Sequence, residues 1–180
     1  MRYLTHAVLT GLCALTLSAC ASTMGAGSHV QTGLRMSQYR TYDWGPADAL
    51  PTGDARLDKD PDFQDHLEGA VEKQLAGKGL VRATGAPDLL FHYHASIDTR
   101  IDVGRTEREY GSCQAADCQS WVVDYEAGTL VLDVVDARTH RLIWRGWAQD
   151  RVAPMLGDRD RMREKINEAI GRMMASFPRP

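Results

Sequence analysis

Two histidines stand two residues apart in the segment FHYHAS, at His92 and His94. Alternate side chains of an extended strand point to the same face, so both imidazoles would lie on one side of a sheet. Such a pair supplies two nitrogen ligands to a metal ion, and Asp133 or His140 would have to complete the site. The simpler interpretation is a pair of surface histidines on a solvated face. We therefore expect no metal site, with His92 and His94 as the candidates for the alternative.

Acidic side chains offer a second chemistry. Asp124, Glu126, Asp133 and Asp136 lie close together in the sequence, and a glycosidase holds two carboxylates at a fixed separation across a cleft. Their spacing does not indicate such a cleft, because acids also alternate with apolar residues on any solvated sheet face. The sequence contains no G-x-S-x-G, H-E-x-x-H, Walker A or G-x-G-x-x-G motif. We expect a protein that is not an enzyme, with a cell-wall hydrolase as the residual alternative.

Three tryptophans, Trp121, Trp144 and Trp147, are the candidates for an aromatic platform that binds a glycan or a peptide. Trp144 and Trp147 are three positions apart, so they face opposite sides of a regular strand. We expect one of them in the core and the other exposed, with packing as the main role of these rings.

The N-terminal segment carries a lipid-attachment motif. Arg2 precedes an uncharged, mostly apolar stretch from Ala7 to Leu17, which is shorter than the roughly 20 residues of a membrane-spanning helix and suits the core of a signal peptide. The sequence LSAC at 17–20 resembles the lipobox of bacterial lipoproteins. That resemblance implies a diacylglyceride on the thiol of Cys20, cleavage just before Cys20, and acylation of the new amine, for example with palmitate. The alternative is an ordinary signal peptide with a chance cysteine.

The predicted lipid indicates where in the cell the protein lies. Two or more acyl chains anchor a protein stably, whereas one gives only marginal membrane binding. Ala21 stands where inner-membrane lipoproteins of the enteric type carry aspartate, so we expect the periplasmic face of the outer membrane. We interpret residues 1–19 as the signal peptide and residues 20–29 as the lipidated cysteine with a flexible tether.

A second cysteine pair, Cys113 and Cys118, lies in the segment GSCQAADCQS. In an oxidising periplasm an even pair at short range predicts a disulfide. Closing so small a loop stabilises the fold by only about 2 kcal/mol. Free thiols and a metal site are the alternatives, the latter being two ligands short of a structural zinc site.

Length and charge limit the partners. Residues 20–180 are enough for one domain with its own core, which we place at residues 30–178. Loss of the signal peptide removes Arg2 and changes the net charge from −3 to −4. The basic residues are scattered, so we expect no nucleic-acid partner.

The candidate residues need a sheet to position them. The segment TYDW at 41–44 predicts a short strand, and residues 87–103 alternate with a period of two. Leu89, Phe91, Tyr93, Ala95 and Ile97 would share one face of that strand, opposite Leu90, His92, His94 and Ser96. Residues 128–148 predict a hairpin that turns at DARTH, and SWVVDYEA at 120–127 predicts a further strand just before it.

Two amphipathic helices would cover this sheet. Asp60 and Pro61 suit the cap and first position of a helix that Gly77 and Gly79 end. A second helix begins near Asp158 and ends before Pro178. The order β-α-β-β-β-α predicts an α+β two-layer sandwich, with an antiparallel-rich sheet and both helices on one face.

Four segments carry a family resemblance: YRTYDW (39–44), PDLLFHYH (87–94), GTLVLDVVDARTHRLIWRGWA (128–148) and the closing helix that ends in FP. Over roughly residues 28–178 the chain resembles the bacterial lipoprotein family known as domain of unknown function 4136. The resemblance implies an envelope-anchored α+β domain and brings no catalytic residue.

We expect an outer-membrane lipoprotein that acts as an envelope structural or interaction module. It would meet an envelope protein or cell-wall partner through an exposed sheet face or edge strand. It would need no cofactor beyond the covalent lipid on Cys20. The alternative is a small-ligand or metal-binding lipoprotein that uses His92 and His94.

Overall fold

A computed structural model describes residues 24–45, 54–58, 60–102, 123–153 and 155–180 of the chain. These residues form one six-stranded sheet in the order β1-β6-β5-β4-β2-β3. Pairing is antiparallel from β1 to β4 and parallel between β4, β2 and β3. The antiparallel-rich sheet confirms the predicted α+β class. The strands are β1 (Gly25–Val30), β2 (Thr41–Trp44), β3 (Val81–Arg82), β4 (Leu89–Asp102), β5 (Val123–Asp136) and β6 (Arg141–Arg151).

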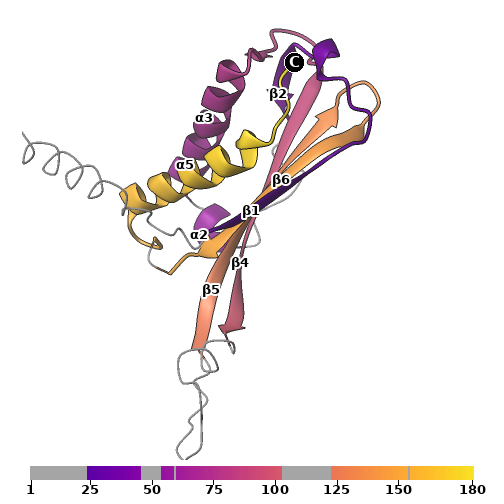
Figure 1. Ribbon diagram of the computed structural model, residues 1–180. Helices are drawn as coiled ribbons and strands as arrows, with labels where there is room; N and C mark the ends of the chain where they lie inside the picture. The colour runs from indigo at the N-terminus through magenta and orange to yellow at the C-terminus, as the bar shows by residue number, and fades with distance from the viewer. Residues whose placement is uncertain (1–23, 46–53, 59, 103–122, 154) are drawn as a thin grey trace, which may run out of the picture.

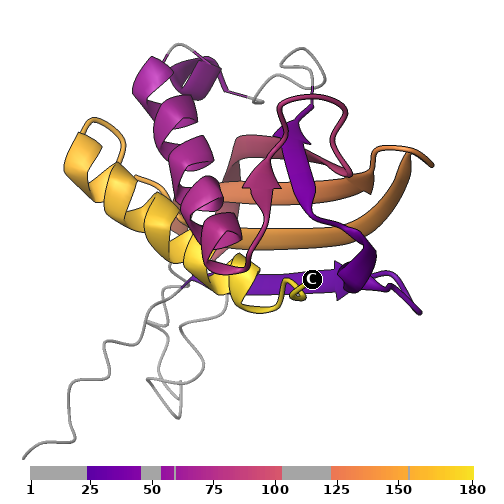
Figure 2. The same ribbon diagram turned by 90° about the horizontal axis from the view of Figure 1, so that it is seen from above.

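Two long helices, α3 (Pro61–Gly77) and α5 (Arg159–Ala175), pack together on one face of the sheet (Figures 1 and 2). Both predicted starts are confirmed, because the side chains of Asp60 and Asp158 accept hydrogen bonds from backbone N–H groups of the first turns. Gly79 follows α3 with a φ of +86°, the left-handed conformation that ends many helices. Two short elements, η2 (Met36–Gln38) and α2 (Ala55–Asp58), complete the described structure.

The core lies between the helices and the sheet. Alternation places Leu89, Phe91 and Ala95 of β4 on the helix side, where they are buried as predicted. Phe177, just after α5, packs its ring against Trp144 of β6 and Phe91, with ring centroids 5.2 and 6.0 Å apart. The C-terminal end of the helix layer is therefore held to the middle of the sheet by aromatic contacts.

Strand β1 corrects the predicted tether. Residues 25–29, interpreted from sequence as flexible, pair with β6 along the register Gly25↔Gln149 to Val30↔Trp144. The residues at 20–23 lie outside the described part of the chain. The segment GAGSHV lacks an alternating pattern, but backbone hydrogen bonds to an open sheet edge do not require one. Arg172 of α5 also donates to the backbone oxygen of Met24 at 2.9 Å, which fixes the entry into β1.

Three further details differ from the expectation. The predicted separate strand at 120–127 is, from Val123 onward, the first part of a continuous β5. The short helix α2, which precedes α3, and the short β3, which extends the parallel edge, were not predicted. These elements are too short to leave a periodic pattern in the sequence.

Strands β4 and β5 extend beyond their neighbours at one end of the sheet. They pair as far as Asp102↔Val123, whereas β6 leaves β5 at Ala127↔Arg151. The remainder is a two-stranded ribbon that projects from the sheet (Figure 1). At its base Arg151 stacks over the ring of Tyr125, 4.3 Å from the centroid.

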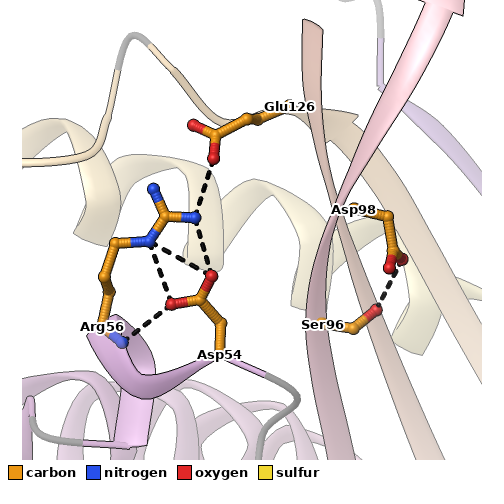
Figure 3. Close-up of polar contacts among 5 residues, drawn as sticks. All are labelled: Asp54, Arg56, Ser96, Asp98 and Glu126. Atoms are coloured by element: carbon orange, nitrogen blue, oxygen red, sulfur yellow. Dashed lines mark hydrogen bonds and ion pairs between the residues drawn. The ribbon is translucent and has the colours of Figure 1, made fainter.

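An ion-pair triad joins α2 to the sheet. Arg56 Nη2 lies 2.7 Å from Asp54 Oδ2 and 2.8 Å from Glu126 Oε1 of β5 (Figure 3). Hydrogen bonds from Arg56 lower the pKa of Asp54 to about 2. Neighbouring charges at this surface favour the position of α2, although exposed pairs of this kind add little stability.

Candidate functional site

The predicted histidines lie on the sheet face opposite α3 and α5. In the described part of the chain no helix covers this face (Figure 2). Strand register arranges its side chains in two rows across β4, β5, β6 and β1. We call these eight residues the open-face cluster: His92, Asp133, Arg145 and His29 in the first row, and His94, Val131, Trp147 and Gly27 in the second.

A two-pronged ion pair stands at the centre of the cluster. Arg145 Nε lies 2.6 Å from Asp133 Oδ1, and Nη2 lies 2.6 Å from Oδ2. Asp133 is only 7% exposed, so its charge needs this partner. The hydrogen bonds to Asp133 raise the pKa of Arg145. The pair links β5 to β6 at directly opposite positions, and it uses both carboxylate oxygens of Asp133.

His94 stands beside this pair without joining it. Its Nε2 lies 4.0 Å from Asp133 Oδ2. Burial lowers the pKa of His94, and the negative charge of Asp133 opposes the effect only partly. The charge of Asp133 is already matched by Arg145, so burial prevails over the attraction. His94 is therefore neutral at pH 7.

The structure brings the two histidines to one face but does not assemble a full ligand set around them. Among the described residues there is no group of three or more histidine, cysteine, aspartate or glutamate side chains able to hold a metal ion. Asp133, the expected third ligand, is bound to Arg145. The other expected ligand, His140, lies in the turn between β5 and β6. The ring of His92 lies over Gly45, where any Cβ would collide with it.

Trp147 is the exposed aromatic residue of the cluster. It is 43% exposed, whereas Trp144 is fully buried, which confirms the predicted division between these two rings. A Cβ at Gly27 would come within 2.7 Å of the indole of Trp147, so the missing side chain lets the ring lie close against β1. The sequence indicated neither that contact nor the strand that makes it.

The other predicted acids are not gathered with Asp133. Asp136 is buried at the end of β5, where Tyr39 donates to its Oδ2 at 2.8 Å. Glu126 binds Arg56, and Asp124 is exposed on the projecting ribbon. Asp133, Asp136 and Glu126 thus make bonds that hold the fold.

Several predicted sites lie outside the described residues. These are the signal peptide, Cys20, Trp121, and the pair Cys113 and Cys118. Within the part that is described, no helix has the length and apolar character needed to cross a bilayer.

Comparison with known proteins identifies relatives of the fold. The family model of a domain of unknown function, DUF4136, matches residues 28–179. The solved structure of a DUF4136 family protein from Bacteroides thetaiotaomicron aligns with a TM-score of 0.52 and 10% identity, over 83% of this chain and 95% of that one. This likeness shows a shared fold. A search of curated proteins found no match.

Two other solved structures align less well. PelC from Paraburkholderia phytofirmans, solved as a dodecamer, has a TM-score of 0.49 and 9% identity over 87% of this chain and 99% of that one. A PDZ domain protein from Parabacteroides distasonis has a TM-score of 0.48 and 15% identity over 87% of this chain. The chain spans only 37% of the length of that protein.

Proposed function

Since the chain belongs to the DUF4136 family, we propose that it is a lipid-anchored, non-enzymatic interaction module of the bacterial envelope that binds a partner through its open-face cluster. The partner is an envelope protein or the cell wall. The observation that carries this proposal is the exposed indole of Trp147 on a sheet face that no described helix covers.

The surface around Trp147 suits recognition. Tryptophan and arginine are the residues on which binding energy most often concentrates. Here Arg145 is held by Asp133, and the indole lies against β1, so neither side chain loses much freedom when a partner docks. Val131, directly opposite Trp147 on β5, extends the apolar contact.

The anchor fits the same arrangement. Cys20 stands four residues before Met24, so the lipid would lie within about 14 Å of this buried residue, which directly precedes β1. β1 is an edge strand of the sheet and also carries His29 and Gly27 of the cluster. A lipid on Cys20 would therefore hold the open-face cluster close to a membrane surface.

Photocrosslinking in living cells tests the binding surface. A photoreactive amino acid replaces exposed His29 in the full chain, with Trp147 intact or changed to alanine. We expect a discrete adduct that Trp147→Ala reduces at least fivefold. Digestion of the adduct with a muramidase distinguishes a cell-wall partner from a protein.

The matched control places the same photoreactive residue at Val81, which is exposed on the opposite edge of the sheet. It should give no such adduct. Equal adducts at positions 29 and 81, or an adduct at 29 that does not depend on Trp147, would contradict the proposed surface.

A further inference from the structure

A polar cleft of about 200 Å³ lies at the end of the sheet, and it shares no lining residue with the open-face cluster. The chain that follows β1 forms one wall and the turn from β5 to β6 forms the other, so residues about a hundred positions apart meet there. An engineered protein cavity of about 150 Å³ accommodates benzene. The cleft therefore has room for a single six-membered ring.

Two guanidinium groups line this cleft. Arg35 comes from the wall after β1 and Arg141 from the start of β6. In the part of the chain that the structure describes, neither side chain forms an ion pair or a hydrogen bond. The cations of the cleft are thus available to an anion.

The one acid of the cleft does not neutralise them. Asp136 accepts hydrogen bonds on both oxygens, from the backbone N–H groups of Arg138 and Thr139 and from the hydroxyl of Tyr39. Asp136 and Tyr39 are 7% and 5% exposed. They form a rigid buried floor, and the net charge of the lining residues remains positive.

Neutral polar side chains complete the lining. Gln31, Gln38 and Thr139 line the cleft together with Arg35 and Arg141. Amide and hydroxyl side chains form hydrogen bonds with the hydroxyl groups of a ligand. The cleft thus presents two cations for an acid group and neutral polar groups for ring hydroxyls.

From this arrangement we infer that the cleft binds an anionic monosaccharide unit, whose acid group meets Arg35 and Arg141 and whose ring hydroxyl groups meet Gln38 and Thr139. Planar guanidinium groups pair with both oxygens of a carboxylate or a phosphate. The ring fills the polar space above Tyr39. This inference depends neither on the lipid at Cys20 nor on Trp147.

Calorimetric titration of the full-length protein in nonionic detergent tests the inference, with glucuronate and glucose 6-phosphate as probes. We expect at least one of them to bind, and the pair distinguishes a carboxylate from a phosphate ligand. Arg141→Gln and Arg35→Gln should each weaken binding about tenfold or more, as loss of a charge-assisted hydrogen bond predicts. Gln38→Leu should weaken binding of the sugar acid but not of acetate or inorganic phosphate.

Arg100→Gln is the matched control, because it removes the same charge from the exposed ribbon and should leave the affinity unchanged. Circular dichroism verifies that every variant is folded. The inference is overturned if neither probe binds, if glucose binds as well as the acids, or if Arg100→Gln weakens binding as much as Arg141→Gln. Equal affinity for glucuronate and acetate overturns recognition of the sugar ring.

Discussion

At the scale of single residues, the behaviour of His94 depends on how its neighbours share their charges. An aspartate 4.0 Å away would ordinarily favour the protonated imidazole. Arg145 binds that aspartate through two hydrogen bonds, which leaves burial as the stronger influence on His94. A histidine next to a carboxylate therefore stays neutral here.

This arrangement predicts a pH dependence of stability. Because the pKa of His94 is lowered in the folded state, the unfolded chain takes up the proton more readily as pH falls below the ordinary value of 6.5. The contribution of His94 to the free energy of unfolding should be fully present above pH 6.5. It should decrease as the pH falls from there toward the folded-state pKa of His94. His94→Gln should reduce that decrease in urea unfolding measured between pH 7.5 and 5.

His29→Gln is the matched control, since His29 is exposed on the same sheet face and should keep the original pH dependence. The carboxylates whose pKa values are lowered, Asp54, Asp88 and Asp136, lose their stabilising effect only below their ordinary value near 3.8 and do not interfere. An unchanged slope in His94→Gln would show that burial does not govern this histidine.

At the scale of elements, each long helix starts at an aspartate that lies outside its first turn. In α5 the side chain of Asp158 accepts from the backbone N–H of Arg161 at 3.0 Å. A helix end leaves its first N–H groups without partners in the helix, so such a side chain defines where the helix begins. Local chemistry thus decides the start of an element whose stability comes mainly from packing.

Asp158→Ala should lower the free energy of unfolding by about 1 kcal/mol through loss of this cap. Urea unfolding followed by far-UV circular dichroism measures the change. Asp158→Asn keeps an acceptor at the same place and should cost much less. If the asparagine variant were as unstable as the alanine variant, the negative charge rather than the hydrogen bond would be responsible.

At the scale of the whole molecule, the helix layer contacts the sheet near the first described residue and near the C-terminus. Arg172 of α5 binds the backbone at Met24, and Phe177 packs on Trp144 and Phe91 in the centre of the sheet. The start of the described chain is therefore fixed to the helix layer. A lipid anchor at Cys20 would therefore position the sheet and the helix layer together relative to the membrane.

Cys20→Ser should abolish lipid anchoring of the protein at the outer membrane. The thiol is the expected acceptor of the lipid, and serine cannot form the thioether. We expect the variant to lose palmitate labelling, to accumulate as a precursor and to leave the outer-membrane fraction on sedimentation. Cys13→Ser alters a cysteine of the same N-terminal segment and should change none of these. Continued labelling and sedimentation of Cys20→Ser would refute the anchor.

Much of the fold follows from local patterns in the sequence. The alternation of Leu89, Phe91 and Ala95 with His92 and His94 settled the two faces of β4, because a strand has a period of two. The cap residues and the apolar stripes located both long helices for the same kind of local reason. The burial of Trp144 and the exposure of Trp147 follow from their spacing of three positions.

What the tertiary structure alone decided are contacts between distant segments. Strand β1 exists because β6 offers an open edge, and Trp147 lies against Gly27 because β1 is there. The bond between Asp133 and Arg145 depends on the register of β5 and β6, and the cleft lined by Gln31, Arg35 and Arg141 depends on a sheet end that no short window of sequence contains. Periodicity determines which way a side chain points, but only the assembled sheet determines what it meets.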